Sequence, residues 1–390
     1  MDDPLVVQAA TVATREAYEA LAERSYGHPV EDIRLLQEHA DIRVALRGGR
    51  VVGGGLGLLL PQYFGGAPVL SACLGAGCVA PEERGGRLAA RVVAERVAAL
   101  RDQGAVVSSI WTASTGYARQ LGWQTIGTTF AWSIRSDEMK RSVRGEDVLI
   151  EHGSTPAARA MQRELAKKWN GPIGRPDWWW DWKAAKANLT TYGFRGSAGE
   201  ACRGLLSIAM ERRQPHGMVL VVHDFWAADA SVAASMLAFL GRHGSRAEEV
   251  TFRRAALPSD PNVLHLLHRY KPVARAWHPW SFRVLDYEAA VRLRGWAPTT
   301  EVDITLGVSD TYGETARYQF SVACGQAILN TTERRPQVTF NDRQFAAWYA
   351  GAYRTSRQAI DAGVSVSDVR ALQPLLGTTT ELDSWLPDLF

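Results

Sequence analysis

Cysteine is scarce in this chain, which has only four, at positions 73, 78, 202 and 324. That number and spacing are too sparse for a disulfide framework, and no histidine stands beside them at the spacing of a zinc site. We therefore expect buried free thiols in a reducing compartment and no metal.

A strong charge of one sign and a long apolar run are also missing. The formal net charge is +3, which is small for 390 residues and implies no nucleic-acid partner. The most apolar run, Val51 to Pro61, is glycine-rich and too short to span a bilayer. The first 21 residues carry acids where a signal peptide would carry lysines. The expectation is a cytoplasmic protein without a membrane partner.

The chain has what a soluble globular protein needs, with 46% hydrophobic and 22% charged residues. Its length exceeds one ordinary core and indicates two or three domains. In the first 138 residues the pattern predicts helices, then strands, then a long amphipathic helix, and last a strand, a short helix and a strand. The predicted ranges are 12–24, 29–40, 42–46, 51–60, 68–80, 88–102, 106–111, 115–120 and 123–135. This order describes one mixed α/β domain.

Two further units follow. Residues 136–150 are polar and linker-like, and from 150 the strand–helix–strand order repeats. A tryptophan-rich stretch, 169–182, follows the first predicted helix of the second unit; inter-domain core and an aromatic cation site are its two interpretations. A third unit, with four strands and then three helices, begins near 287.

The segment from Val79 to Ala89 carries the clearest chemical signal. A strand ends at Pro81, a short Arg/Gly loop follows, and a helix starts at Leu88. Such a loop presents free backbone N–H groups beside the positive end of a helix dipole, an arrangement that favours a bound pyrophosphate.

An ordered set of motifs resembles the Eis (enhanced intracellular survival) acetyltransferases along nearly the full chain. The N-terminal part of the set is 79–88 and 114–123. The rest is Arg175 with Trp178 and Trp179, Pro258 to Asp260, Trp280 with 283–286, Tyr349 with Gly351, 361–363 and 385–390.

The resemblance implies an α/β (α+β) fold with three domains: two tandem GNAT (GCN5-related N-acetyltransferase) folds and a sterol-carrier-protein-like domain. Their expected bounds are 1–138, 150–286 without a CoA loop, and 287–390. The implied activity is transfer of an acetyl group from acetyl-CoA, or another acyl-CoA, to a primary amine of an aminoglycoside, lysine or polyamine-like molecule. A homo-hexamer is implied as well.

The resemblance also implies the cofactor-binding and catalytic residues. The cofactor contacts are Gly77, Cys78, Val79, Arg84, Gly85, Gly86, Arg87, Leu88, Ala89, Ala90, Ser114 and Thr115. Tyr117 would protonate the leaving thiolate. The carboxylate of Phe390, at the chain end, would act as general base. The alternatives are that Tyr117 only packs under the helix and that the chain end at Phe390 is frayed.

Two departures from the family pattern keep other functions open. Arg87 stands where the superfamily loop Q/R-x-x-G-x-G/A has its first glycine, and Tyr117 is shifted by one residue relative to Gly122. The alternatives are a remodelled loop on a scaffold recruited for another reaction in secondary metabolism, and a non-catalytic ligand-binding protein.

Overall fold

The computed structural model describes residues 4–146, 148–185, 189–196, 201–213, 217–269, 271–310 and 313–390. The chain forms two compact units. The first contains residues 1–126, 280–381 and 389–390; the second contains 127–279 and 382–388. None of the helices in the described ranges is long and apolar enough to cross a membrane.

The N-terminal part of the first unit is a sheet with helices on both faces. The strands follow the order β1, β2, β3, β4, β5. Their bounds are β1 Leu5–Ala9, β2 Ala40–Arg47, β3 Arg50–Phe64, β4 Ala67–Val79 and β5 Val107–Trp111. Neighbours are antiparallel except β4 and β5, and the end of β12 (Val273–Val284) pairs with β5. The helical segments are α1 Val12–Tyr26, α2 Glu31–Leu35, η1 Pro81–Glu83, α3 Leu88–Asp102 and α4 Thr115–Gln120.

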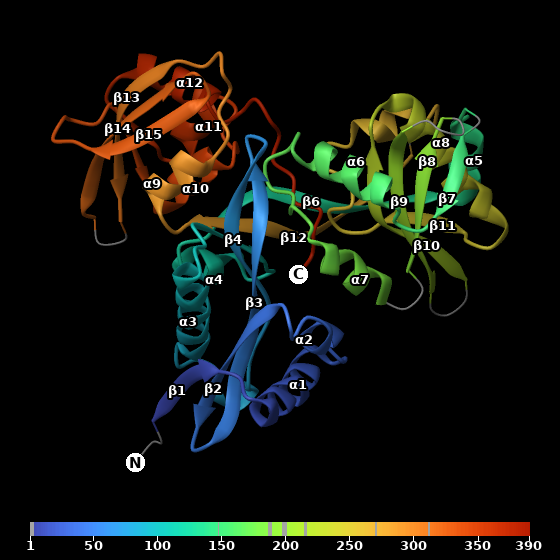
Figure 1. Ribbon diagram of the computed structural model, residues 1–390, viewed down its shortest axis with the longest axis horizontal. Coiled ribbons are helices and arrows are strands. Elements are labelled where there is room, and N and C mark those ends of the chain that lie inside the picture. Colours follow the sequence, from blue (N-terminus) through green and yellow to red (C-terminus); the bar gives the residue numbers. More distant parts are fainter. Residues whose placement is uncertain are drawn as a thin grey trace. The chain divides into compact units, whose positions relative to one another are not determined.

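Helices α1 and α3 cover opposite faces of this sheet (Figure 1). The adjacent residues Gly53 and Gly54 of β3 show this, because a side chain at Gly53 would meet Val92 of α3 and one at Gly54 would meet Tyr18 of α1. The range 88–102 is confirmed as a helix. The predicted helix 29–40 is too long, since α2 is a single short turn and β2 already begins at Ala40.

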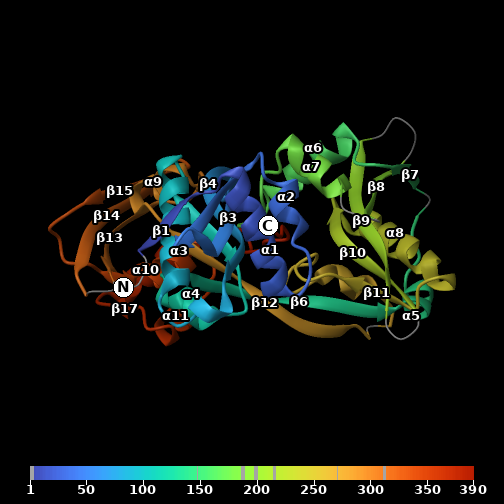
Figure 2. The same cartoon turned by 90° about the horizontal axis from the view of Figure 1, so that it is seen from below.

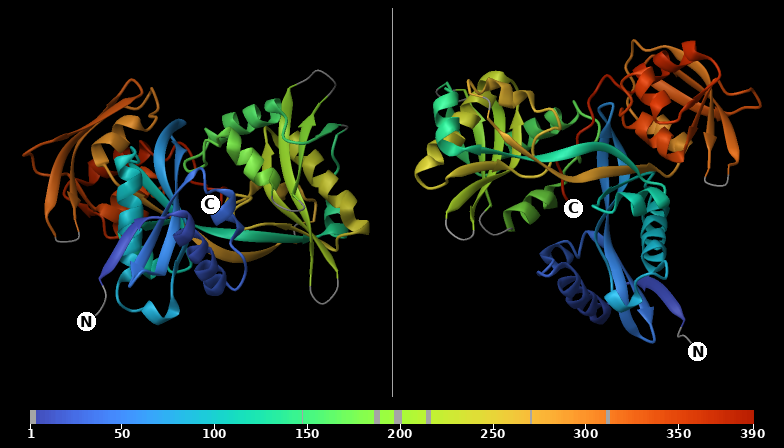
Figure 3. Two further views of the ribbon diagram at one scale, coloured as in Figure 1. Left: turned by 60° about the horizontal axis from the view of Figure 1, so that its bottom comes forward. Right: turned by 180° about the vertical axis from the view of Figure 1, so that it is seen from behind.

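The C-terminal part of the first unit is a five-stranded sheet with helices packed on it (Figure 3). Its strand order is β15, β14, β13, β16, β17. The elements are α9 Tyr287–Leu293, β13 Val302–Ser309, β14 Thr315–Ala323, β15 Gln326–Thr331, β16 Val338–Asn341, α10 Asp342–Tyr349, α11 Ser356–Asp361, β17 Ser365–Val366 and α12 Val369–Gly377. Aromatic rings fill the core; those of Phe320 and Trp348 meet edge to face at 5.2 Å.

The second unit has a sheet with the order β6, β11, β10, β9, β8, β7, in which β10 and β11 are parallel. Helices α6 and α8 both pack on β9 and β10 (Figure 2). The elements are β6 Gln124–Arg135, α5 Ser136–Ser142, β7 Leu149–His152, α6 Pro156–Ala166, α7 Asp177–Ala185, β8 Leu189–Arg195, β9 Cys202–Arg212, β10 Met218–Ala227, α8 Ala230–Gly241, η2 Arg242–Ser245, β11 Glu249–Phe252 and η3 Asn262–Leu266.

The linker-like assignment of 136–150 is wrong, because the segment contains α5 and the start of β7. Acids in the first turn of α5 and bases in its last turn complement the helix dipole, and Met139 is buried. The tryptophan-rich stretch forms α7, with Trp179, Trp180 and Trp182 buried. Guanidinium groups of this unit cover the Trp180 ring, with Arg175 at 5.0 Å and Arg159 at 5.6 Å from its centroid.

All four cysteines carry free thiols, but they are not all buried. Cys73 and Cys202 are buried, Cys78 is half-buried and Cys324 is exposed. The expectation of uniformly buried thiols is therefore wrong for Cys324, which lies in the turn between β14 and β15.

Candidate functional site

A break in the strand pairing opens the N-terminal sheet. Strands β4 and β5 pair only from Ser71 to Leu74 on the β4 side. Just beyond, β4 bulges: Gly75 pairs with Leu56 and Cys78 with Gly54, so two β4 residues oppose one residue of β3. Beyond Leu74, β4 is therefore no longer paired with β5 in the described part of the chain.

Two tyrosines of α1 hold this bulge in place. Ala76 adopts the left-handed conformation, with φ 49°. The Tyr18 hydroxyl donates a hydrogen bond to the Ala76 carbonyl, and the Tyr26 hydroxyl donates one to the Gly77 carbonyl at 2.8 Å. These bonds direct both carbonyls toward α1 and compensate the cost of the strained backbone.

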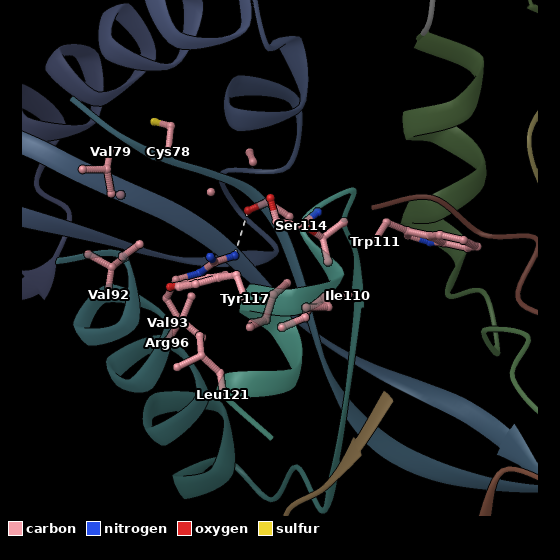
Figure 4. Close-up of a pocket in the computed structure, with 18 of the residues that line it drawn as sticks. Cys78, Val79, Val92, Val93, Arg96, Ile110, Trp111, Ser114, Tyr117 and Leu121 are labelled. Carbon is pink, nitrogen blue, oxygen red and sulfur yellow. Dashed lines mark hydrogen bonds between the residues drawn. The ribbon is translucent and has the colours of Figure 1, made fainter. Parts of the chain in front are cut away.

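The opening leads into a cavity of about 530 Å³ (Figure 4). Its lining comes from the β4 bulge, the end of β5, the inner face of α3, helix α4 and the last residue of the chain. Among the expected site residues, those that line it are Gly77, Cys78, Val79, Arg84, Ala89, Ser114, Tyr117 and Phe390. The others belong to the adjoining loop and helix starts: Gly85, Gly86, Arg87, Leu88, Ala90 and Thr115.

Arg96 lies on the α3 wall of the cavity and is 3% exposed. Its Nη2 donates to the Leu56 carbonyl and, at 2.7 Å, to the Gly75 carbonyl, so the guanidinium spans the bulge. Burial lowers the pKa of Arg96. Sequence analysis missed it, although an arginine between Val92 and Leu100 on an apolar stripe is a detectable signal.

Tyr117 lies beside Arg96 in the cavity (Figure 4). Its hydroxyl is buried and finds no hydrogen-bond partner in the described part of the chain. Burial raises the pKa of Tyr117, and the Arg96 charge opposes the shift. The hydroxyl therefore stays protonated at neutral pH, and a ligand atom in the cavity would satisfy it.

The chain end also reaches this cavity. Phe390 lines it, and its carboxyl group lies against Gly75: a Cβ there would come within 2.7 Å of the carboxyl carbon and 2.8 Å of its oxygen. Only glycine leaves room for the terminus at this position of β4.

Cys78 faces the same cavity as a neutral thiol. Burial raises its pKa to about 11, while the Ser25 hydrogen bond and the Arg96 charge act in the opposite direction. At pH 7 the thiolate population is negligible, so Cys78 is a poor nucleophile.

The loop before α3 ends in a strained arginine. Arg87 occupies the N-cap with φ 59° and ψ 12°, a left-handed conformation that costs a non-glycine residue about 1–2 kcal/mol. Within the described residues, the Arg87 side chain makes no cap hydrogen bond to α3, and no acid lies in the first turn of this helix. The first N–H groups of α3 are therefore available to an anion. Arg87 therefore adopts the left-handed backbone conformation that glycine usually adopts.

Comparison with known families assigns three domains. Residues 7–126 match an acetyltransferase (GNAT) domain model, residues 171–293 match a second model of that description, and residues 287–385 match the sterol carrier protein domain. No curated protein matches the sequence. The expected bounds 1–138, 150–286 and 287–390 stay predictions.

Solved structures with the same fold cover essentially the whole chain. The GCN5-related N-acetyltransferase from Anabaena variabilis ATCC 29413 has a TM-score of 0.87 at 18% identity, covering 99% of this chain and 100% of its own. The one from Kribbella flavida has a TM-score of 0.82 at 22% identity, covering 100% and 99%. Eis1 from Mycobacterium abscessus has a TM-score of 0.75 at 18% identity, covering 99% and 100%.

Proposed function

From two acetyltransferase (GNAT) domains followed by a sterol carrier protein domain, in a chain with the fold of Eis1, we propose that this protein transfers an acyl group from acyl-CoA to the primary amine of a small molecule. The observation that carries the proposal is the lining of one cavity. It joins the Tyr117 hydroxyl, which has no partner among the described residues, with the C-terminal carboxylate and the bulged edge of β4. The start of α3, which Arg87 does not cap, adjoins the cavity.

The residues around the cavity fit an acyl-CoA donor. The free N–H groups of α3 suit the pyrophosphate, with Arg84 and Arg87 adding positive charge, and the edge of β4 at Gly77 to Val79 suits the amide-bearing pantetheine arm. Acetyl-CoA is the donor we propose, and the acceptor is an aminoglycoside, lysine or polyamine-like amine.

Direct attack on the thioester is the mechanism that these side chains support. The amine nitrogen attacks the thioester carbon, the C–S bond breaks, and the acyl group ends on nitrogen. The Phe390 carboxylate accepts the proton lost by the amine, and Tyr117 donates its proton to the leaving thiolate. A covalent acyl-Cys78 intermediate is disfavoured because that thiol stays protonated.

Incubation with acetyl-CoA and a panel of aminoglycosides, lysine and polyamines tests the proposal, with released thiol as the readout and calorimetry for CoA binding. Turnover with at least one amine is the expected result. Failure of every amine together with absent CoA binding contradicts it and favours the second candidate, a scaffold recruited for another reaction. The specific observation for that candidate is Arg87 at the glycine position of the loop.

Replacing Tyr117 with phenylalanine is expected to lower kcat about 10²-fold, because thiolate expulsion loses its proton donor. A general acid works in its protonated form, so wild-type activity should fall as pH rises through the raised pKa of Tyr117, above its ordinary value of 10.0. The pH profile of the variant should lack this alkaline limb. Tyr192→Phe, in β8 of the second unit, is the matched control. If Tyr117→Phe keeps both the wild-type kcat and the alkaline decline in activity, the Tyr117 hydroxyl is not the proton donor and the side chain only packs.

Gly75→Ala is expected to lower kcat/KM by about 10- to 100-fold, since the new Cβ would displace the C-terminal carboxyl group. The control is Gly116→Ala in α4, where a Cβ meets nothing within 4 Å. Steady-state kinetics and thermal unfolding on both variants separate misplacement of the carboxylate from general instability. Unchanged kinetics for a folded Gly75→Ala protein would argue against a role for the terminus.

A further inference from the structure

The second unit repeats the layout that forms the first cavity. Strands β10 and β11 are parallel, as β4 and β5 are, and α8 follows β10 as α3 follows β4. A cavity of about 450 Å³ lies at the corresponding place, between the end of β10, the start of α8 and the segment after β11. Its volume is in the range of small-molecule sites.

The helix start at this second cavity is already capped by a carboxylate and is a poor site for an anion. Asp229 caps α8, and its Oδ1 accepts hydrogen bonds from the Ser231 N–H at 3.0 Å and the Val232 N–H at 3.1 Å. The hydrogen bond from Arg203 is the main cause that holds the pKa of Asp229 low, so the cap is charged at neutral pH. A carboxylate thus occupies the position that corresponds to the start of α3. The Ser231 and Val232 N–H groups are already hydrogen-bonded and are not available to a pyrophosphate.

Three indole rings form one wall. The Trp385 ring lies 5.0 Å from that of Trp169 and 4.8 Å from that of Trp226, measured between centroids. The Trp385 Nε1 donates to the Ala255 carbonyl at 2.8 Å, which fixes the ring. A rigid aromatic wall favours a flat, apolar ligand.

One ring of this aromatic wall has an unsatisfied hydrogen-bond donor. Trp226 is 2% exposed, and its indole N–H finds no acceptor in the parts of the chain that the structure describes. A buried donor without a partner is costly, and a ligand oxygen within reach would remove that cost.

We propose that the second acetyltransferase-type domain binds a neutral, planar, mainly apolar small molecule with an acceptor oxygen, in the cavity lined by Trp169, Phe225, Trp226, Leu257, Leu266 and Trp385. The oxygen accepts from Trp226 Nε1, and the flat body lies against the indoles. The site is independent of acyl transfer, since no group from the first cavity takes part.

Nile red, a neutral planar dye with a carbonyl group, is the probe. Fluorescence titration of the full chain should give saturable binding of one dye per chain that CoA does not compete with. Ala228→Trp, at an exposed position beside the cavity, should weaken binding at least tenfold, and Trp226→Phe should weaken it severalfold by removing the donor. Ala157→Trp, exposed near the start of α6, is the matched control and should bind as wild type does.

Four outcomes overturn the proposal. The first three are no saturable binding, displacement of the dye by CoA, and wild-type binding by Ala228→Trp. The fourth is an equal loss in the Ala157→Trp control, because dye binding would then not report on the cavity. Circular dichroism on each variant identifies a misfolded protein. Trp226→Phe removes the indole N–H together with the five-membered ring but keeps an aromatic ring at this position, so it stays interpretable if Ala228→Trp does not fold.

Discussion

One glycine added after Phe390 is expected to lower kcat for acyl transfer by about 10²- to 10⁴-fold, the range for loss of a general base. The extension converts the terminal carboxylate into a neutral amide and moves the charge one residue onward. In the native chain that carboxylate lies against Gly75 in the cavity. Thiol release at saturating acyl-CoA and amine measures the effect.

Two controls distinguish the effect of moving the carboxylate from the effects of the Phe390 ring and of a longer chain. Phe390→Leu keeps the carboxylate at the same point of the chain and should lose far less activity than the extension. A glycine inserted between Gly48 and Gly49, in the exposed hairpin turn joining β2 and β3, should leave the kinetics unchanged. An extended protein with full kcat would remove Phe390 from the proposed mechanism.

Replacing Asp388 with alanine is expected to destabilise the second unit by about 3–5 kcal/mol, because it leaves a buried guanidinium short of a partner. Asp388 Oδ1 accepts from Arg175 Nε at 2.8 Å, and its Oδ2 accepts from the Ile173 N–H at 3.0 Å. The side chains of Arg175 and Asp388 are 1% and 0% exposed. Urea unfolding followed by fluorescence measures the change.

The matched control is Asp361→Ala, which removes an exposed i,i+4 pair with Arg357 at 2.8 Å. That change should cost no more than about 0.5 kcal/mol. Equal effects of the two substitutions would contradict the importance of the buried pair.

Acid should weaken the same buried network through Asp224. Its carboxylate accepts from Arg175 Nη2 at 2.6 Å and from Lys183 Nζ. Burial alone would raise the pKa of Asp224, but the Arg175 and Lys183 charges outweigh it and hold the pKa well below 3.8. The unfolded chain then binds more protons than the folded one below about pH 4, so this contribution to stability falls as pH falls.

Local patterns predicted the elements whose apolar spacing is regular and failed where burial depends on distant partners. Helix α3 was predictable because Leu88, Val92 and Leu100 repeat at helical spacing. Helix α5 is hard to distinguish from a linker in the sequence, because its short polar segment buries only Ser136, Met139 and Ser142. The role of Arg96 was not predictable, since the carbonyls that it binds come from two strands far along the chain.

The pairing of Arg175 with Asp388 shows the same division. Both residues belong to motifs that carry the resemblance to the Eis acetyltransferases, yet 213 positions separate them, and no local pattern connects them. Only the folded second unit, which includes residues 382–388, brings them together.

The sequence by itself determined most of the order of strands and helices in the N-terminal domain, the Arg/Gly loop before α3 and the resemblance to the Eis acetyltransferases, because these follow from short-range periodicity and motif order. The tertiary structure alone decided the conformation of the loop and the place of the terminus. It put Arg87 in a backbone shape usual for glycine, left the Tyr117 hydroxyl unpartnered and laid the Phe390 carboxyl group against Gly75. Those features arise from strand divergence and long-range packing, which depend on contacts between residues distant in the chain.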